Sequence, residues 1–211
     1  MSGVYLIGIT GASGSGKSTL AKQIMDELAC STLYLTQDMY YKNALHLTEQ
    51  QRKQLNYDAP QTFDFALLRR DLKELVAGRP IERREYDFVH YRRYDKDELL
   101  PPAQVLILEG IHVFYDDEIR SMLDLKIFVQ LDADLCILRR LRRDLLERGR
   151  TVDSVIEQYV KTVKPMYETY IRNYASMADI VMPNVYESHK AVEIIVEYVN
   201  KATAPQPCPT L

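Results

Sequence analysis

Eight residues near the N-terminus have the types and spacing needed to hold a chain of phosphates. They read Gly11-Ala12-Ser13-Gly14-Ser15-Gly16-Lys17-Ser18 and fit the pattern G-x-x-x-x-G-K-[ST] at every fixed position. Glycines let successive backbone N–H groups point inward at phosphate oxygens, and a helix that begins there adds its positive N-terminus. In this pattern the lysine reaches the β- and γ-phosphates, and the serine hydroxyl ligates magnesium.

The surroundings of this loop favour phosphate binding over a chance match in a Gly/Ser-rich turn. The short apolar run Val4–Ile9 precedes it and indicates a buried strand, and the amphipathic pattern of Lys17–Ala29 predicts a helix after it. We therefore expect ATP to bind a continuous stretch of the chain: Gly11, Ala12, Ser13, Gly14, Ser15, Gly16, Lys17, Ser18 and Thr19.

Two acidic residues stand at the ends of expected strands. Glu109 follows the apolar run Val105–Leu108, at the sheet edge where α/β proteins bind ligands, and an acid there commonly holds magnesium. Asp38 ends the second expected strand and could accept the proton of an attacking hydroxyl or contact magnesium. From position alone, an Asx turn or a helix cap explains Asp38 equally well. For Glu109 the alternative is an acid that merely meets solvent.

A cluster of arginines falls on an expected helix. Arg139, Arg140, Arg142, Arg143, Arg148 and Arg150 face only Asp144 and Glu147 in that stretch. Arginine forks match phosphate oxygens, so a flap at about residues 135–152 could close over ATP and exclude water. For two or three of these side chains a solvated, salt-bridged helix face is the alternative. A spacing of four residues predicts that Ile137, Leu141 and Leu145 form the core face of this helix.

Composition limits the class of protein. The chain has 211 residues, with 27 Lys plus Arg against 30 Asp plus Glu, and its net charge of -3 argues against a dedicated nucleic-acid binder. The three cysteines, Cys30, Cys136 and Cys208, show no metal-ligand spacing and form a poor disulfide framework. No apolar run is long enough for a signal segment or a membrane span. We expect a cytoplasmic protein that does not bind membranes.

Alternating strands and helices predict a three-layer αβα fold with a central parallel sheet. Strands are expected at Val4–Ile9, Thr32–Leu35, Val105–Leu108, Leu125–Leu131 and Ile180–Met182, with half of a hairpin at Ile81–Val89. Helices are expected at Lys17–Ala29, Asp64–Ala77, Asp134–Glu147 and Glu187–Lys201, with a long helix after Asp153 that Pro165 interrupts. The face of Asp64–Ala77 expected to be buried carries Leu68, Leu72, Leu75 and Val76.

These elements fit a single P-loop domain over residues 1–202. Insertions at about residues 39–63 and 80–100 would bind a second substrate, and the Arg-rich flap would act as a lid. The proline-rich residues 203–211 are expected to form a disordered tail.

Beyond the P-loop, several segments resemble the uridine/cytidine kinase family over nearly the whole chain, from Val4 to about Val199. They are Thr36-Gln37-Asp38-Met39-Tyr40-Tyr41, Asn56-Tyr57-Asp58-Ala59-Pro60, Tyr86-Asp87-Phe88, Leu108-Glu109-Gly110-Ile111, the run from Asp132 to Arg150, Gln158-Tyr159 and Val163-Lys164-Pro165. The resemblance implies a P-loop enzyme that transfers the γ-phosphoryl of ATP (or GTP) to the 5′-hydroxyl of uridine or cytidine, in pyrimidine salvage.

The resemblance also assigns roles. It makes Asp38 the general base, and Lys17, Arg143 and Arg148 its partners in catalysis. Magnesium would be surrounded by Ser18, Asp38 and Glu109. The nucleoside would contact Asp38, Tyr41, Tyr57, Asp58, Tyr86, Phe88, Tyr91, Ile111, Arg140, Arg150 and Gln158. Asp58 would bind the ribose 2′- and 3′-hydroxyls, which suggests weaker binding of 2′-deoxynucleosides. A homotetramer is implied as well.

Three positions depart from the family pattern. Tyr91 stands where many relatives have a histidine that reads the pyrimidine 4-position. A phenol can accept a hydrogen bond from the cytosine amine but is less well suited to interact with O4 of uracil, so we expect a preference for cytidine. Ala59 replaces a frequent histidine after the ribose aspartate. Pro183-Asn184 replaces Pro-Arg-Gly near the donor base.

Two kinds of rival function remain at this stage. One is another P-loop small-molecule kinase that resembles phosphoribulokinase or pantothenate kinase. The other is a non-catalytic nucleotide-binding switch. A GTPase switch would need an Asn-Lys-x-Asp motif to recognise guanine, and the Asn200-Lys201 pair lacks the aspartate.

Overall fold

The central sheet consists of five parallel strands in the order β2-β5-β1-β6-β7. The computed structural model describes residues 3–184 and 189–204. The strands are β1 (Tyr5–Gly11), β2 (Thr32–Thr36), β5 (Val105–Glu109), β6 (Leu125–Gln130) and β7 (Ile180–Pro183). Their near-continuous apolar runs suit strands that are covered on both faces. The P-loop strand β1 lies at the centre, between β5 and β6.

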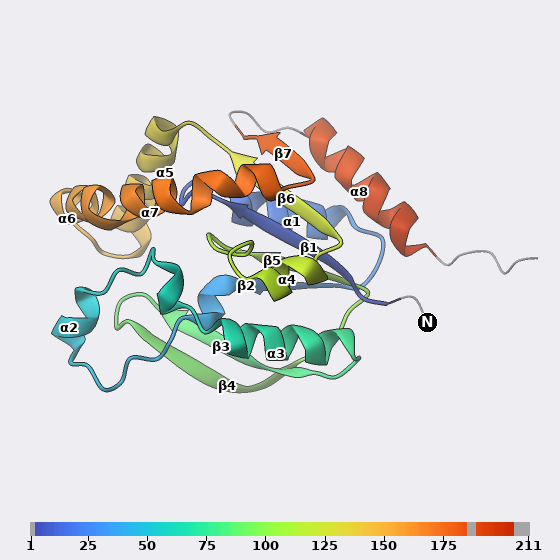
Figure 1. The fold of residues 1–211 in the computed structure, drawn as a ribbon, viewed down its shortest axis with the longest axis horizontal. Coiled ribbons are helices and arrows are strands. Elements are labelled where there is room, and N and C mark those ends of the chain that lie inside the picture. Colours follow the sequence, from blue (N-terminus) through green and yellow to red (C-terminus); the bar gives the residue numbers. More distant parts are fainter. Residues whose placement is uncertain (1–2, 185–188, 205–211) are drawn as a thin grey trace, which may run out of the picture.

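Helices cover both faces of this sheet (Figure 1). On one face α1 (Lys17–Glu27) packs beside α8 (His189–Thr203) against residues such as Ile7, Ile107 and Ile127. On the other face lie α3 (Phe65–Val76), α4 (Asp117–Met122) and the 3₁₀-helix η4 (Ile171–Met177). The predicted three-layer αβα fold with a parallel sheet is confirmed.

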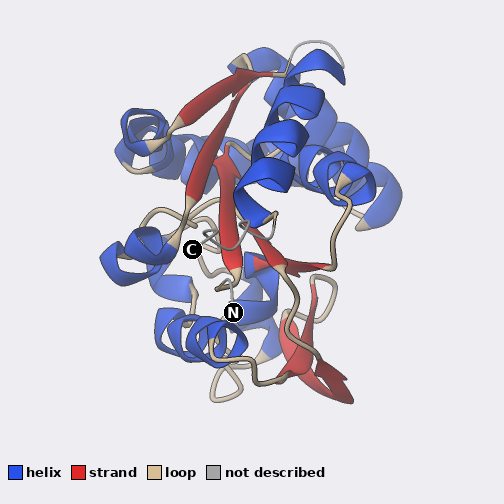
Figure 2. Cartoon of the chain, turned by 90° about the vertical axis from the view of Figure 1, so that its right-hand side faces the viewer, coloured by secondary structure: helices blue, strands red, loops and turns tan. Residues whose placement is uncertain are grey.

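The first insertion holds short helical pieces and the second is a hairpin. The hairpin pairs β3 (Ile81–Asp87) with β4 (Arg92–Leu100) in antiparallel register, and Figure 2 shows it standing apart from the central sheet. Its base packs against α3 and the 3₁₀-helix η1 (Gln37–Tyr40). The first insertion contains α2 (Glu49–Lys53) and the 3₁₀-helix η2 (Pro60–Thr62).

The arginine-rich segment forms α5 (Ala133–Glu147) and is followed by α6 (Val152–Gln158), the π-helical turn η3 (Tyr159–Val163) and α7 (Lys164–Thr169). The long helix expected after Asp153 is therefore interrupted, as predicted. The irregular turn lies just before Pro165, which occupies the first turn of α7, where its missing N–H costs little.

Several details of the sequence prediction are wrong. The short helix α4 was not expected. Val76 is 42% exposed and does not belong to the core face of α3. Thr203, expected to begin the tail, is the buried last residue of α8. Residues 205–211 and Glu187 lie outside the described residues. Within the described ranges, no helix combines the length and the apolar character needed to cross a membrane.

Candidate active site

The loop between β1 and α1 approaches other elements too closely for side chains at two of its glycines. Gly14 and Gly16 have φ values of 85° and 95°, in the left-handed region that favours glycine. A Cβ at Gly14 would collide with the backbone carbonyl of Cys136, and one at Gly16 with the side-chain amide of Asn184. That amide donates to the Ser15 carbonyl at 2.6 Å. The first turn of α5 and the residue that follows β7 thus pack directly against the loop.

Lys17 is held under this loop by a hydrogen bond to the backbone. Its ammonium donates to the Ala12 carbonyl at 2.8 Å, and the residue is 8% exposed. Burial lowers the pKa of Lys17, and the carboxylates of Glu109 and Asp38 oppose that shift. No side chain caps the first turn of α1, and that turn has no acidic residue. Its backbone N–H groups can therefore receive an anion.

Glu109 lies at the end of β5, paired in register with Ile9 of β1 and Thr36 of β2. Its Oε1 accepts hydrogen bonds from Ser18 Oγ at 3.2 Å, Thr36 Oγ1 at 3.1 Å and the Tyr34 hydroxyl at 3.0 Å. The carboxylate is buried and fixed in place, which contradicts the alternative of an acid that merely meets solvent. Sequence reasoning missed Thr36 and Tyr34. Their alternation along β2 is the pattern that could have placed them on the same side of that strand.

Asp38 lies in η1, directly after β2. Thr36 caps this helix by accepting a hydrogen bond from the Asp38 N–H, so the helix-cap interpretation of Asp38 is wrong. Burial, and then the nearby Glu109 carboxylate, raise the pKa of Asp38 to about 6, while Arg148, Lys17 and Arg143 oppose the shift. A carboxylate with a pKa near neutrality is well suited to accept a proton during a reaction.

These side chains fit a magnesium ion. Hard divalent cations prefer oxygen ligands, and Ser18, Asp38 and Glu109 supply a hydroxyl and two carboxylates at one end of the sheet. The Glu109 carboxylate also helps to raise the pKa of Asp38, and a cation between the two groups would relieve that repulsion. The donor chemistry of these side chains suits magnesium, and the ligand set stays a prediction.

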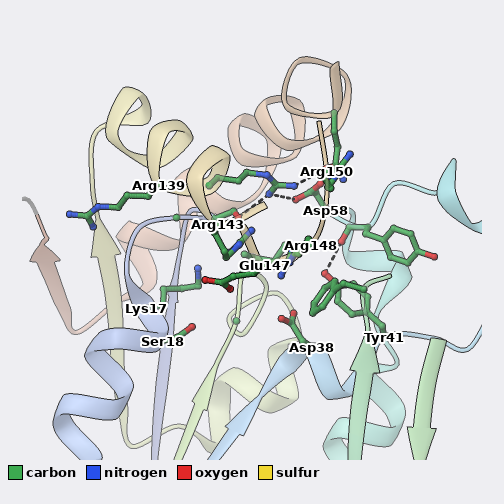
Figure 3. A pocket seen from close by; sticks show the side chains of 18 of the residues that line it. Lys17, Ser18, Asp38, Tyr41, Asp58, Arg139, Arg143, Glu147, Arg148 and Arg150 are labelled. Carbon is green, nitrogen blue, oxygen red and sulfur yellow. Dashed lines mark hydrogen bonds and ion pairs between the residues drawn. The ribbon is translucent and has the colours of Figure 1, made fainter. Parts of the chain in front are cut away.

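One cavity of about 910 Å³ gathers most of the predicted site (Figure 3). Its walls include Ser13, Gly14, Gly16, Lys17, Ser18, Thr19, Asp38, Tyr41, Tyr57, Asp58, Phe88, Tyr91, Glu109, Ile111, Arg140, Arg143, Arg148, Arg150 and Gln158. The predicted residues that do not line it are Gly11, Ala12, Ser15 and Tyr86. Lining residues that had no expected role are Lys53, Val89, Gly110, Glu147 and Gly149.

Asp58 is buried in this cavity at 6% exposure. The hydroxyl of Thr162, from η3, lies 3.2 Å from Asp58 Oδ2, and Arg140 Nη1 lies 3.6 Å from Oδ1. The ring of His112 contacts the Asp58 backbone carbonyl through Nε2 at 2.7 Å. Sequence reasoning missed Thr162 and assigned no chemistry to His112.

Aromatic side chains form the wall opposite the P-loop. Tyr41 stacks on Phe63 with ring centroids 4.2 Å apart, and Tyr57 stacks on Tyr91 at 5.2 Å. The ring centroids of Tyr86 and Tyr41 are 4.7 Å apart and Tyr86 does not line the cavity, so Tyr86 lies behind this wall. Tyr91 ends the hairpin turn with a φ of 53°, a region that bulky side chains rarely adopt.

A buried carboxylate organises the arginines of the expected lid. Asp144 is fully buried, and four guanidinium groups approach it. Arg143 Nη2 lies at 2.8 Å from its Oδ1, Arg148 Nη1 at 3.5 Å from the same oxygen, and Arg140 Nε and Arg150 Nη1 at 3.5 and 3.9 Å from Oδ2. This network holds the cationic groups together beside the cavity, although they repel one another.

Three of these arginines also reach other elements, and Arg150 does so by donating to Ser154 and Gln158 of α6. Arg140 donates to Ser13 Oγ of the P-loop at 2.9 Å and to Gln158 Oε1 of α6 at 3.0 Å. The Arg148 guanidinium lies 3.9 Å from the centroid of the Phe88 ring, in a cation–π contact that joins α5 to the hairpin. Arg139, in contrast, points away from Arg143 and toward the Asn184 backbone carbonyl (Figure 3).

The predicted core face of α5 is wrong. The residues that are buried are Cys136, Arg140 and Asp144, whereas Ile137, Leu141 and Leu145 are half-buried. A count of apolar residues could not find this stripe, because two of its three members are charged residues that form an ion pair.

Comparison with known proteins places the chain in a family. The profile of the phosphoribulokinase/uridine kinase family matches residues 6–191. A uridine kinase of Lactiplantibacillus plantarum is 42% identical over 195 residues, which are 92% of this chain and 93% of that protein. The chain belongs to the phosphoribulokinase/uridine kinase family. A uridine kinase of Bacillus cereus (strain AH187) is 45% identical over 194 residues, or 90% and 91% of the two chains.

Solved structures of two other kinases share the fold of this chain. Phosphoribulokinase from Rhodobacter spheroides superposes with a TM-score of 0.63 at 21% identity, over 85% of this chain and 70% of that one. D-glycerate 3-kinase from Cryptococcus neoformans gives a TM-score of 0.57 at 15% identity, over 80% and 79%. The resemblance to the uridine/cytidine kinase family drawn from the sequence is confirmed.

Proposed function

We propose that this protein is a nucleoside kinase that transfers the γ-phosphoryl group of ATP (or GTP) to the 5′-hydroxyl of uridine or cytidine. One observation carries the proposal above the others. A single cavity holds Lys17 and the P-loop at one end, Asp58 and the aromatic wall at the other, and Asp38 among them. Two similar uridine kinases, from L. plantarum and B. cereus, support the same substrate class.

The chemistry assigns a task to each end of the cavity. The P-loop amides and Lys17 would hold the triphosphate, and Asp38 would accept the proton of the attacking hydroxyl. Magnesium held by Ser18, Asp38 and Glu109 would neutralise charge on the β- and γ-phosphates. Arg143 and Arg148 would stabilise the charge that spreads over the transferred group.

At the other end, we assign Asp58 to the ribose diol, with Arg140, Arg150 and Gln158 beside the nucleoside. A carboxylate can accept one hydrogen bond from each of two neighbouring hydroxyls. The base would lie against Tyr41, Tyr57, Phe88, Tyr91 and Ile111, with Tyr86 supporting that wall from behind. We further propose that the chain forms a homotetramer, by its resemblance to the family, which light scattering on the purified protein would test.

Tyr91 is the position to which we assign base preference. Its left-handed backbone is costly for a tyrosine, and such strain gathers at functional sites. Its ring stacks on Tyr57 and lines the cavity. We propose that cytidine is preferred over uridine, and that Tyr91→His reduces this preference. The measurement is kcat/KM for both nucleosides, and equal or better use of uridine by the unaltered protein would refute the preference.

A coupled assay with uridine, cytidine and 2′-deoxycytidine, each with ATP and with GTP, tests the main proposal. We expect turnover of the two ribonucleosides and much weaker turnover of the deoxynucleoside. Phosphoribulokinase-like and pantothenate kinase-like functions are tested in the same panel by ribulose 5-phosphate and pantothenate. Turnover of either of these, without turnover of nucleosides, would replace the proposal. Binding of ATP without any turnover would favour a nucleotide switch.

A further inference from the structure

His112 is a fully buried histidine that the proposed mechanism does not use. It lies three residues beyond the Glu109 end of β5. Its ring Nε2 lies 2.7 Å from the Asp58 backbone carbonyl, and its ring Nδ1 lies 2.9 Å from the Tyr174 hydroxyl in η4. Its backbone N–H donates to the Gln37 side-chain carbonyl at 2.9 Å. Three segments that are far apart in the sequence therefore meet at this one residue, two at its ring and one at its backbone N–H.

The chemistry of the partners decides the protonation of the ring. A backbone carbonyl can only accept, so Nε2 must carry a proton and donate it to Asp58. In the neutral ring Nδ1 is then an acceptor, and the Tyr174 hydroxyl donates to it. Burial lowers the pKa of His112 to about 4, with Lys17 adding to the shift and the Asp58 carbonyl opposing it, so the ring is neutral near pH 7. Both ring nitrogens are satisfied in this one tautomer.

These hydrogen bonds lie beside Asp58, at the end of the cavity assigned to the ribose. It fixes the backbone at Asp58, whose carboxylate points into the cavity between Thr162 and Arg140. The same histidine holds Gln37, the residue directly before Asp38. Burying a polar ring costs free energy that an apolar residue of similar size would not, which argues that the ring orients its partners.

We propose that His112, itself oriented by Tyr174, is a positioning residue that holds the Asp58 carboxylate in the geometry needed to recognise the ribose diol. This inference rests on the proposed function, because that function assigns Asp58 to the ribose. It predicts that loss of the imidazole impairs recognition of the 2′-hydroxyl in particular, and leaves the triphosphate end of the cavity unchanged.

The test compares His112→Leu, which removes the donor, with Val113→Ala as a matched control. Val113 is also fully buried, adjacent in the chain and without side-chain hydrogen bonds, so its truncation reports general loosening of the core. The measured quantities are kcat and KM for cytidine, 2′-deoxycytidine and ATP. In H112L the ratio of kcat/KM for cytidine to that for 2′-deoxycytidine should fall by about fivefold, the equivalent of one hydrogen bond. The KM for ATP should stay within about twofold, and V113A should keep the unaltered ratio.

Two further variants keep the test decisive. His112→Gln retains a side-chain N–H that can donate to the Asp58 carbonyl. Its ratio of kcat/KM for cytidine to that for 2′-deoxycytidine should lie between those of H112L and the unaltered protein. Tyr174→Phe removes the donor to Nδ1 and should lower the ratio by about threefold, since the ring can then change tautomer. If H112L does not fold, Y174F carries the test. An unchanged ratio in the folded variants, or an equal fall in V113A, would overturn the inference.

Asp58→Asn separates this inference from the function on which it rests. If D58N lowers the ratio and H112L does not, the inference fails while the assignment of Asp58 survives. If D58N leaves both the ratio and the KM for cytidine unchanged, the assignment of Asp58 to the ribose fails, and the inference fails with it.

Discussion

Charged side chains at the P-loop end of the cavity are held in place by hydrogen bonds to other groups of the protein. The Lys17 ammonium is fixed on the Ala12 carbonyl, and the Glu109 carboxylate is fixed by three hydroxyl groups. Groups that need no reorganisation during a reaction stabilise a transition state most effectively. At the scale of single residues, hydrogen bonds to a backbone carbonyl and from side-chain hydroxyl groups therefore orient the charged groups of the site.

His112 gives a prediction about stability and pH. Its folded-state pKa of about 4 lies below the ordinary value of 6.5, so between these values the unfolded chain binds the extra proton. Stability must then fall as the pH falls through this window. Relative to His112→Leu, which lacks the titrating group, the unaltered protein should lose roughly 2 kcal/mol of unfolding free energy between pH 7 and pH 5.

Urea denaturation of both proteins at several pH values measures this difference. The groups nearest the ring are the Asp58 carbonyl and the Tyr174 hydroxyl, neither of which titrates in that window, so the comparison isolates the histidine. Parallel pH profiles for the two proteins would contradict a neutral, buried imidazole.

Site residues could be predicted from the sequence where their partners are close along the chain, and were missed where the partners are distant along the chain. The P-loop and Lys17 could be predicted because the pattern that defines them is local. His112 and Thr162 could not, since their partner Asp58 is 54 and 104 residues away along the chain. Nothing in a lone histidine or threonine signals such a contact, which only the folded arrangement of η3 and the β5 end creates.

At the scale of elements, the hairpin is tied to the rest of the molecule by a buried ion pair. The Arg84 guanidinium of β3 contacts the Asp71 carboxylate of α3, and both side chains are almost fully buried. The Tyr40 hydroxyl donates to the same carboxylate at 3.3 Å. This tie sets the position of the hairpin, and thus of Phe88 in the aromatic wall.

Removing one partner of this pair should destabilise the protein strongly. In Arg84→Met the Asp71 carboxylate stays buried without its main counter-ion, which costs about 3 kcal/mol, the lower end of the usual range because Arg70 still approaches it. Arg83→Met is the matched control. Arg83 pairs with Glu85 and Glu98 at the exposed surface of the same hairpin, so its loss should cost less than about 1 kcal/mol.

Unfolding free energies of the two variants, together with KM for the nucleoside, measure this effect. R84M should also raise KM for the nucleoside, since the aromatic wall loses its anchor. Equal stabilities for R84M and R83M would show that the buried pair does not hold the hairpin.

The strands could be predicted more reliably than the faces of the helices. Strands buried on both sides are continuous apolar runs, as in β1 and β5, and such runs are plain in a sequence. The face of α5 was mispredicted because it buries Arg140 and Asp144, whose charges compensate each other. The short helix α4 offers only six residues, too few for a periodic pattern.

At the scale of the whole molecule, the topology brings chemistry from distant segments to one edge of the sheet. Strand β1 ends in the P-loop, β5 ends in Glu109 and β2 leads into Asp38, and all three are parallel neighbours. The hairpin and α5 then approach each other across the open end, joined by Arg148 and Phe88. Parallel strands with helical crossovers place their carboxyl ends at a common edge, which is why ligands bind there.

Asp38→Asn tests most directly the central claim, that a carboxylate between the two ends of one cavity accepts the proton of the sugar hydroxyl. The amide keeps the size of the side chain but cannot serve as the base, so kcat should fall by a factor of about 10² to 10⁴. Calorimetric titration should show that ATP still binds, because the P-loop amides and Lys17 are unchanged. A D38N variant that turns over cytidine and uridine at the unaltered rate would contradict the account.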